Sequence, residues 1–176
     1  MNIHLINRCS GGLTKEETSE EHDIERNIFT QDVFMNDQLE IALHLSNDKI
    51  QFTGKARGNP EIIMDYFPPV GNGEGYTGLE LLLMSLSGCS ATSIVGILKK
   101  MNKNVIAFHA GARGIRRTTH PTSFERIFLS FHLTSDNTAD ADIEKAIEMS
   151  EDTICPVWNM LKNSVEIITV YEIHKI

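Results

Sequence analysis

The sequence predicts an α+β domain in which antiparallel β-sheets pack around one long central helix. Segments with strand-like alternation of apolar and polar residues lie on both sides of a long apolar segment at 78–101. That segment opens on a helix-start signal, Thr77 followed three residues later by Glu80. Two shorter helical segments precede a final strand. The resulting order, β-β-β-α-β-β-α-α-β, is typical of the α+β class.

The N-terminal part of the chain differs in composition from the rest. Six acidic residues fall between Lys15 and Arg26, which indicates a solvated acidic segment. We therefore predict an N-terminal acidic extension over 1–37 and a folded domain over 38–176. Cys9 lies in the extension, and we assign it no role.

Three strands are predicted at the start of the domain. They span 39–45, 49–54 and 61–66, separated by turns rich in Asn, Asp, Gly and Pro. The segment 67–77 contains two prolines and three glycines, which predicts a loop.

The long helix contains an uncharged run of 18 residues, from Leu81 to Leu98. This length reaches the threshold for a membrane-spanning helix. Five serines and threonines make the run too polar for that role, so we expect the buried helix of a globular core. The run is apolar on more faces than one sheet can cover, which predicts that a second copy of the chain buries the rest in a homodimer.

The second half of the domain begins with a hairpin of strands at 105–116 and 124–134. In the second strand four apolar residues alternate with other side chains and predict one buried face: Ile127, Leu129, Phe131 and Leu133. A helix at 140–150, a short helix from Cys155 to about Asn163 and a strand at 165–173 follow.

Composition excludes several classes of function. The formal net charge is −8 and the pI is about 5.3, and the arginine cluster, Arg113, Arg116 and Arg117, is small. Nucleic-acid binding is therefore disfavoured, including a KH-like mode, which needs a Gly-x-x-Gly clamp on a basic surface. Three cysteines do not form a secreted disulfide framework, and residues 1–6 do not make a signal peptide. We expect a cytoplasmic protein that does not bind membranes.

Two cysteines are candidate reactive groups. Small residues flank Cys89, so another molecule could reach its sulfur. Cys155 precedes Pro156, a residue favoured at the first helical position, so Cys155 is the expected N-cap. A helix N-terminus lowers a thiol pKa and favours the thiolate. From the residues alone, either cysteine could be the more reactive one, and both could be ordinary core thiols.

Three segments resemble the OsmC-like/organic hydroperoxide resistance family. They are Leu79–Met101 with its Ser87-Gly88-Cys89 motif, Phe124–Ile127, and Cys155-Pro156 after an acidic helix. The likeness covers about residues 38–176 and is closer to the OsmC-like branch. It implies an intertwined homodimer that reduces organic hydroperoxides, with Cys89 as the peroxidatic thiol and Cys155 as the resolving thiol. The two would form a disulfide, which an external dithiol then reduces without any metal or organic cofactor. The apolar side chains near Cys89 favour an alkyl or fatty-acyl hydroperoxide.

The sequence departs from the family pattern at two positions. Active members carry a carboxylate ten residues before the first cysteine, whereas here Glu80 lies nine residues before Cys89. Glu80 is a candidate catalytic residue, and its place in a capping box is the alternative explanation. The family's active-site arginine has no clear equivalent, since Arg57 lies in a turn and in no matching motif. The second hypothesis is therefore a non-enzymatic dimeric protein that senses redox state or binds a small ligand.

The histidines offer a further alternative. A Cys-His hydrolase would need His109, His120 or His132 to meet Cys89 in space, and strand or turn histidines are more often structural or exposed. The seven histidines show no metal-ligand spacing with the cysteines, so no metal site is predicted.

Overall fold

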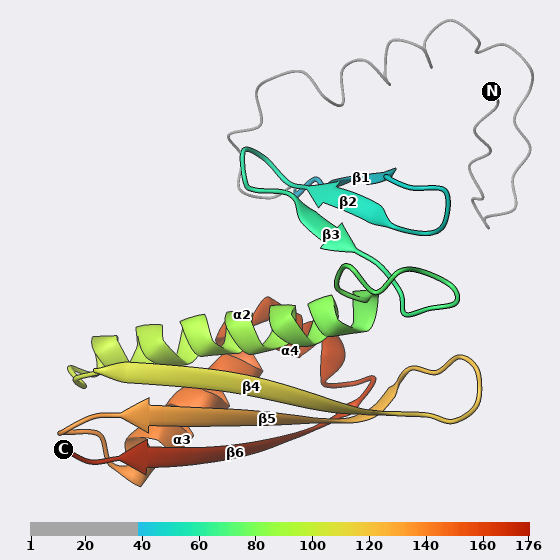
Figure 1. Cartoon of the computed structure of the whole chain (residues 1–176). Coiled ribbons are helices and arrows are strands. Elements are labelled where there is room, and N and C mark those ends of the chain that lie inside the picture. The colour runs from blue at the N-terminus through green and yellow to red at the C-terminus, as the bar shows by residue number, and fades with distance from the viewer. Residues whose placement is uncertain (1–38) are drawn as a thin grey trace, which may run out of the picture. The chain divides into compact units, whose positions relative to one another are not determined.

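The computed structural model describes residues 39–176, and Ile41–Ile176 form one compact unit. The acidic extension and Cys9 lie outside the described residues. Residues 39–176 form six strands and three α-helices in the predicted order, with one additional π-helical turn (Figure 1). The α+β prediction is therefore confirmed.

A small antiparallel sheet opens the domain. Its strands are β1 (Ala42–Leu45), β2 (Phe52–Lys55) and β3 (Ile62–Met64), in the order β1-β2-β3. Each is shorter than its predicted segment. Many of its apolar side chains are exposed in the single chain: Leu43, Leu45, Phe52, Ile62 and Ile63.

The long helix α2 runs from Gly78 to Lys100. The predicted capping box is present, since the Thr77 side chain accepts from the Glu80 N–H and the Glu80 side chain accepts from the Thr77 N–H. Within residues 39–176, α2 is the one helix long and apolar enough to cross a membrane by length and composition. Four of its residues instead belong to the hydrophobic core of the domain, and Ser90 is buried beside them: Leu86, Ile94, Ile97 and Leu98.

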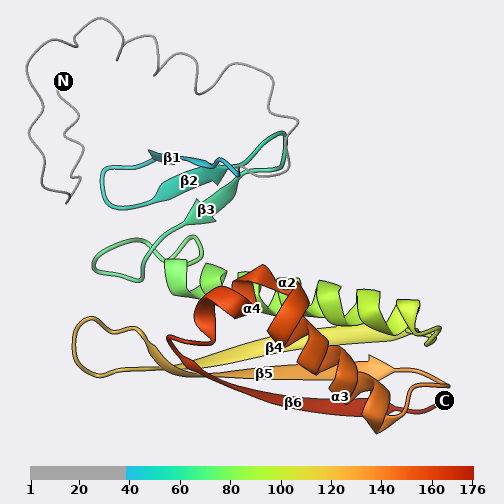
Figure 2. The same ribbon diagram turned by 180° about the vertical axis from the view of Figure 1, so that it is seen from behind.

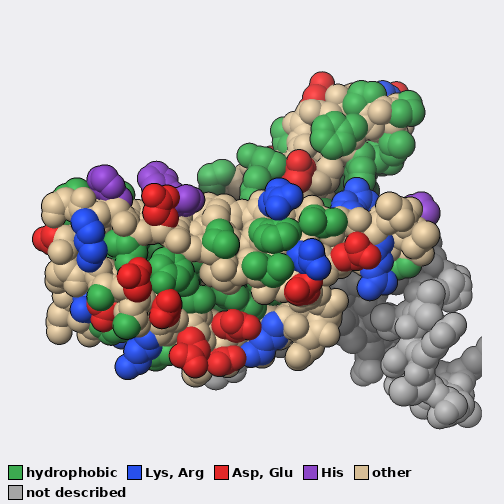
Figure 3. Space-filling view, turned by 90° about the horizontal axis from the view of Figure 1, so that it is seen from below, with side chains coloured by type: hydrophobic (Ala, Val, Ile, Leu, Met, Phe, Trp, Pro, Cys, Tyr) green, Lys and Arg blue, Asp and Glu red, His purple; other side chains and the backbone are tan. Residues whose placement is uncertain are grey.

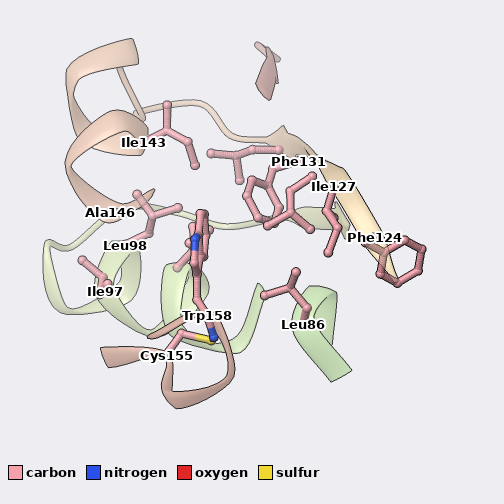
Figure 4. Close-up of a cluster of buried hydrophobic side chains, with 13 residues drawn as sticks. Leu86, Ile97, Leu98, Phe124, Ile127, Phe131, Ile143, Ala146, Cys155 and Trp158 are labelled. Atoms are coloured by element: carbon pink, nitrogen blue, oxygen red, sulfur yellow. The ribbon is translucent and has the colours of Figure 1, made fainter. Parts of the chain in front are cut away.

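The larger sheet combines β4 (Ala107–Arg116), β5 (Phe124–Thr134) and β6 (Glu166–His174). Helices α3 (Asp140–Met149) and α4 (Pro156–Leu161) cover one face of it (Figure 2). The four alternating apolar residues predicted to face the core from β5 are at most 1% exposed. They pack with Trp158 and with residues of α2 and α3 (Figure 4).

The pairing of β6 corrects one detail of the expected antiparallel sheets. β4 and β5 pair antiparallel, but β5 and β6 pair parallel. Parallel neighbours need a long crossover, and residues 135–165 with α3 and α4 provide it. The alternation of apolar and polar residues within a strand does not depend on the direction of its neighbour, so the sequence did not predict the parallel pairing.

Candidate thiol site

Cys89 lies in the middle of α2 and is half-buried. It packs against the core on the same helical face as Leu82 and Leu86, seven and three residues earlier. The pKa of its thiol is raised, first by burial and then by the neighbouring Cys155 thiol, while the Val157 N–H acts in the opposite direction. Cys89 is therefore more fully protonated at neutral pH than an exposed cysteine.

Cys155 is 1% exposed and forms the N-cap of α4, as predicted. The Trp158 N–H donates to Sγ of Cys155 at 3.4 Å, and the Ser90 hydroxyl lies 3.7 Å from the same sulfur. Figure 4 shows the Cys155 side chain directed toward Trp158 in the apolar core. Substrate in solvent therefore has less access to this sulfur than to that of Cys89.

A π-helical turn, η1 (Ser150–Ile154), places Cys155. The Cys155 N–H donates to the Ser150 carbonyl at 2.9 Å, which closes the wide turn. Cys155 then adopts an extended conformation before Pro156 starts α4. The sequence predicted the helices on both sides of this turn but not the turn itself. π-turns of this kind are often found at functional sites.

The structure brings Cys89 and Cys155 together although 66 positions separate them in the sequence. The Cys155 thiol is close enough to raise the Cys89 pKa through a hydrogen bond and through charge. Both thiols are free. A neighbouring pair of this kind can be oxidised in two steps, first to a sulfenic acid on one sulfur and then to a disulfide. The sequence did not predict the contact of Ser90 with Cys155 or that of Val157 with Cys89, because those contacts join distant segments.

Glu80 forms the capping box at the start of α2. Its Oε2 accepts from the Thr77 N–H at 2.7 Å and from the Thr77 hydroxyl at 2.9 Å. These bonds lower the pKa of Glu80. Nine helical residues correspond to a rise of about 13 Å and two and a half turns, a net rotation of about 180°. Glu80 and Cys89 therefore lie on opposite faces of α2.

The other candidate residues lie away from the thiols. Arg57 has a φ of 55° in an exposed turn between β2 and β3. His109 and His132 pair across β4 and β5, on the face opposite the buried residues of β5. His120 is exposed between these two strands. Among residues 39–176, neither a histidine nor an arginine contributes to the pKa of Cys89.

Two hollows flank the N-terminal half of α2. The first, about 440 Å³, lies between α2 and β4, and the second, about 250 Å³, is bordered by the loop after β3 and by Phe124. Glu80 and Leu83 line both hollows, and Cys89 lines neither. Both are largely apolar and open, which is the character of a surface that a second chain or an apolar ligand could cover.

Comparisons with known proteins agree with this architecture. A model of the OsmC-like protein family matches residues 71–170. Protein YhfA of Escherichia coli (strain K12) is 31% identical over 126 residues, which are 70% of this chain and 90% of YhfA. The crystal structure of a hypothetical protein from Aquifex aeolicus VF5 is 27% identical with a TM-score of 0.70, over 80% of this chain and 98% of that one. An organic hydroperoxide resistance protein OsmC from Legionella pneumophila shares the fold at 11% identity and a TM-score of 0.60, over 78% and 98% of the two chains.

Proposed function

Because this chain belongs to the OsmC-like protein family, we propose that it is a thiol-dependent peroxidase that reduces organic hydroperoxides to alcohols. One observation carries the proposal: two free thiols from distant parts of the chain lie beside each other, one half-buried and one fully buried. Relatives of the same fold named as organic hydroperoxide resistance proteins support a redox role.

The proposed reaction begins at Cys89. Its thiolate attacks the distal oxygen of the hydroperoxide, so that an S–O bond forms and the O–O bond breaks. The alkoxide leaves with a proton as the alcohol, and Cys89 becomes a sulfenic acid. Cys89 takes this role because it is the less buried of the two thiols and is flanked by Ser87, Gly88 and Ser90.

Cys155 then resolves the sulfenic acid. Its sulfur attacks the Cys89 sulfur, a disulfide forms and water leaves. The Trp158 N–H and the Ser90 hydroxyl face the Cys155 sulfur and can donate to it as it acquires negative charge. An external dithiol reduces the disulfide by exchange and is itself oxidised, which restores both thiols. No metal or bound organic cofactor enters this cycle.

We propose for Glu80 a structural role as the helix cap, since its carboxylate is engaged by Thr77 and faces away from Cys89. The apolar neighbours of Cys89, Leu82 and Leu86, favour a small apolar hydroperoxide over hydrogen peroxide. With its thiols unpaired, the protein is suited to the reducing cytoplasm, where we propose that it acts.

We also propose that the protein works as a homodimer. One face of α2 is exposed in the single chain, including Met84 at 50% exposure, Gly88 and Gly96. Apart from the chain neighbours and the nearby backbone of α2 itself, no atom of residues 39–176 lies within 4 Å of a Cβ built on either glycine. An exposed apolar helix face beside an exposed apolar sheet is typical of a surface that a second subunit covers.

A second candidate function is a non-enzymatic redox sensor or small-ligand-binding protein. The observation that favours it is the raised pKa of Cys89, with no cation among the described groups that shift it. A thiol held in its protonated form reacts slowly with peroxide.

A turnover assay separates the two functions. Cumene hydroperoxide, a fatty-acid hydroperoxide and hydrogen peroxide are each supplied with a dithiol, and consumption is measured for wild type and for Cys89→Ser, Cys155→Ser and the control Cys9→Ser. We expect consumption of the two organic hydroperoxides to be abolished by Cys89→Ser and unchanged by Cys9→Ser. Cys155→Ser should show one rapid oxidation to a sulfenic acid and slow recycling. If the wild type consumes only one equivalent of hydroperoxide per chain and does not turn over, the result supports the sensor function. Turnover in Cys89→Ser with a sulfenic acid trapped on Cys155 shows that the roles are reversed.

A further inference from the structure

Histidines and a carboxylate share one row on the outer face of the larger sheet. His109 of β4 is the register partner of His132 of β5, and His132 is the partner of Glu172 of β6. All three side chains are exposed and lie on the face opposite the helices. Figure 3 shows histidine side chains beside acidic ones at the end of the molecule that carries the C-terminus. Nothing in the thiol chemistry uses this row.

The carboxylate orients one imidazole. Nδ1 of His132 lies 3.2 Å from Oε2 of Glu172. In the neutral imidazole that donates this bond, the proton is on Nδ1 and the lone pair of Nε2 is free. Metal-binding histidines in proteins commonly have their second ring nitrogen bonded to a carboxylate in this way. Glu172 therefore prepares His132 to be a ligand.

The imidazole of His109 can reach the same metal ion as that of His132, because the two residues are directly opposed on β4 and β5. Directly opposed residues on antiparallel strands have Cβ atoms about 4.5–5.5 Å apart, so two imidazoles can reach one ion at Zn–N distances of about 2.0–2.1 Å. The next register row holds Gly111 and Ser130, which are small and leave the imidazoles uncovered on that side. A third histidine, His174, lies one row away in the other direction, opposite Thr134.

We propose that His109 and His132 bind a divalent transition-metal ion of the zinc type, with Glu172 orienting His132. Imidazole nitrogen suits zinc, nickel and copper, and magnesium and calcium prefer oxygen ligands. Residues 39–176 contain no group of three or more histidine, cysteine, aspartate or glutamate side chains arranged to hold a metal ion. The site therefore has two protein ligands, and water completes the coordination. The bound ion would join β4 to β5 at the outer face of the sheet.

Residue-resolved NMR of the untagged full-length protein tests the proposal. Zn²⁺ is titrated into the protein while the histidine imidazole resonances are followed. Because these resonances report each histidine separately, the measurement distinguishes this site from zinc bound by thiols elsewhere in the chain. We expect saturable shifts at His109 and His132, and none at the same concentration of Mg²⁺. His109→Gln or His132→Gln should abolish the saturable response, and Glu172→Gln should weaken the affinity about tenfold.

The control variant is His120→Gln, whose side chain is exposed between β4 and β5. We expect it to bind Zn²⁺ as the wild type does, and the backbone spectrum of each variant reports whether the sheet is intact. The proposal is overturned if Zn²⁺ leaves His109 and His132 unshifted, or if His132→Gln binds as tightly as the control.

Discussion

The role of Glu80 can be decided by separating the stability of the protein from its activity. The capping box contains three hydrogen bonds between Thr77 and Glu80, of 2.7, 2.9 and 3.3 Å. Thr77→Ala removes the hydroxyl and with it two of these bonds. Loss of an N-cap side chain costs about 1 kcal/mol of unfolding free energy. For a chain of 176 residues that corresponds to a fall in Tm of about 2–4 °C.

Glu80→Gln separates the charge from the hydrogen bond. The amide oxygen can still accept from the Thr77 N–H, so the variant loses mainly the favourable charge at the helix N-terminus, about 0.3–1 kcal/mol. Because the folded-state pKa of Glu80 is lowered, this contribution is complete above the ordinary value of 4.5 and is lost as the pH falls through the folded-state pKa. We therefore expect the Tm difference between wild type and Glu80→Gln to disappear in acid.

The assay pairs thermal unfolding with hydroperoxide turnover. Both variants should lower Tm and leave kcat/KM within about twofold of the wild type, because Glu80 and Cys89 face opposite sides of α2. A group that transfers a proton in the reaction typically contributes 10²–10⁴-fold to the rate. A loss of about 100-fold or more in Glu80→Gln, with normal turnover in Thr77→Ala, would falsify the structural role and make Glu80 a catalytic carboxylate.

Three further predictions concern the thiol, the core and the dimer. Because the pKa of Cys89 is raised above the ordinary thiol value of 9.0, the thiolate fraction grows about tenfold for each unit of rising pH in the neutral range. The first oxidation of Cys89 by hydroperoxide, measured by stopped flow, should accelerate by the same factor. A rate that is constant from pH 6 to 8 contradicts this prediction. Gly114→Ala places a Cβ 2.1–2.8 Å from three ring atoms of Phe124, which predicts a loss of about 1–3 kcal/mol in chemical denaturation, whereas Gly58→Ala, with nothing within 4 Å, should be neutral. Gly96→Leu adds a large side chain to the exposed face of α2, so the variant should sediment as a monomer where the wild type sediments as a dimer. A wild-type chain that sediments as a folded monomer refutes the dimer itself.

Local patterns in the sequence were sufficient to predict most elements of the fold. The alternation in 124–134 predicted the buried face of β5, because side chains on a strand point to opposite sides in turn. Thr77 and Glu80 predicted the start of α2, because both partners of the capping box lie within one helical turn. Pro156 likewise predicted the start of α4 at the residue after Cys155. Each of these signals depends on residues a few positions apart.

The features that were not predicted are an irregular local turn and a contact between distant segments. The π-turn before Cys155 is closed by a bond from the Cys155 N–H to the Ser150 carbonyl, and no residue type in Ser150–Ile154 demands that geometry. The contact of the Ser90 hydroxyl with the Cys155 sulfur joins two elements across the core. Ser90 was recognised only as a small neighbour of Cys89. The sequence therefore indicated the two cysteines as candidates and the cap at Cys155, but not the contact of Cys155 with Ser90.

The parallel pairing of β5 and β6 explains why the two thiols meet. A parallel pair requires the chain to return to the starting end of the sheet, and here α3, η1 and α4 make that return. All three of these elements contact α2, because the return path covers the sheet face on which the buried side of α2 packs. Cys155 lies where η1 ends and α4 begins, beside Ser90 and therefore one residue from Cys89 along α2. The topology that the sequence did not predict is thus what brings together the two residues that it did.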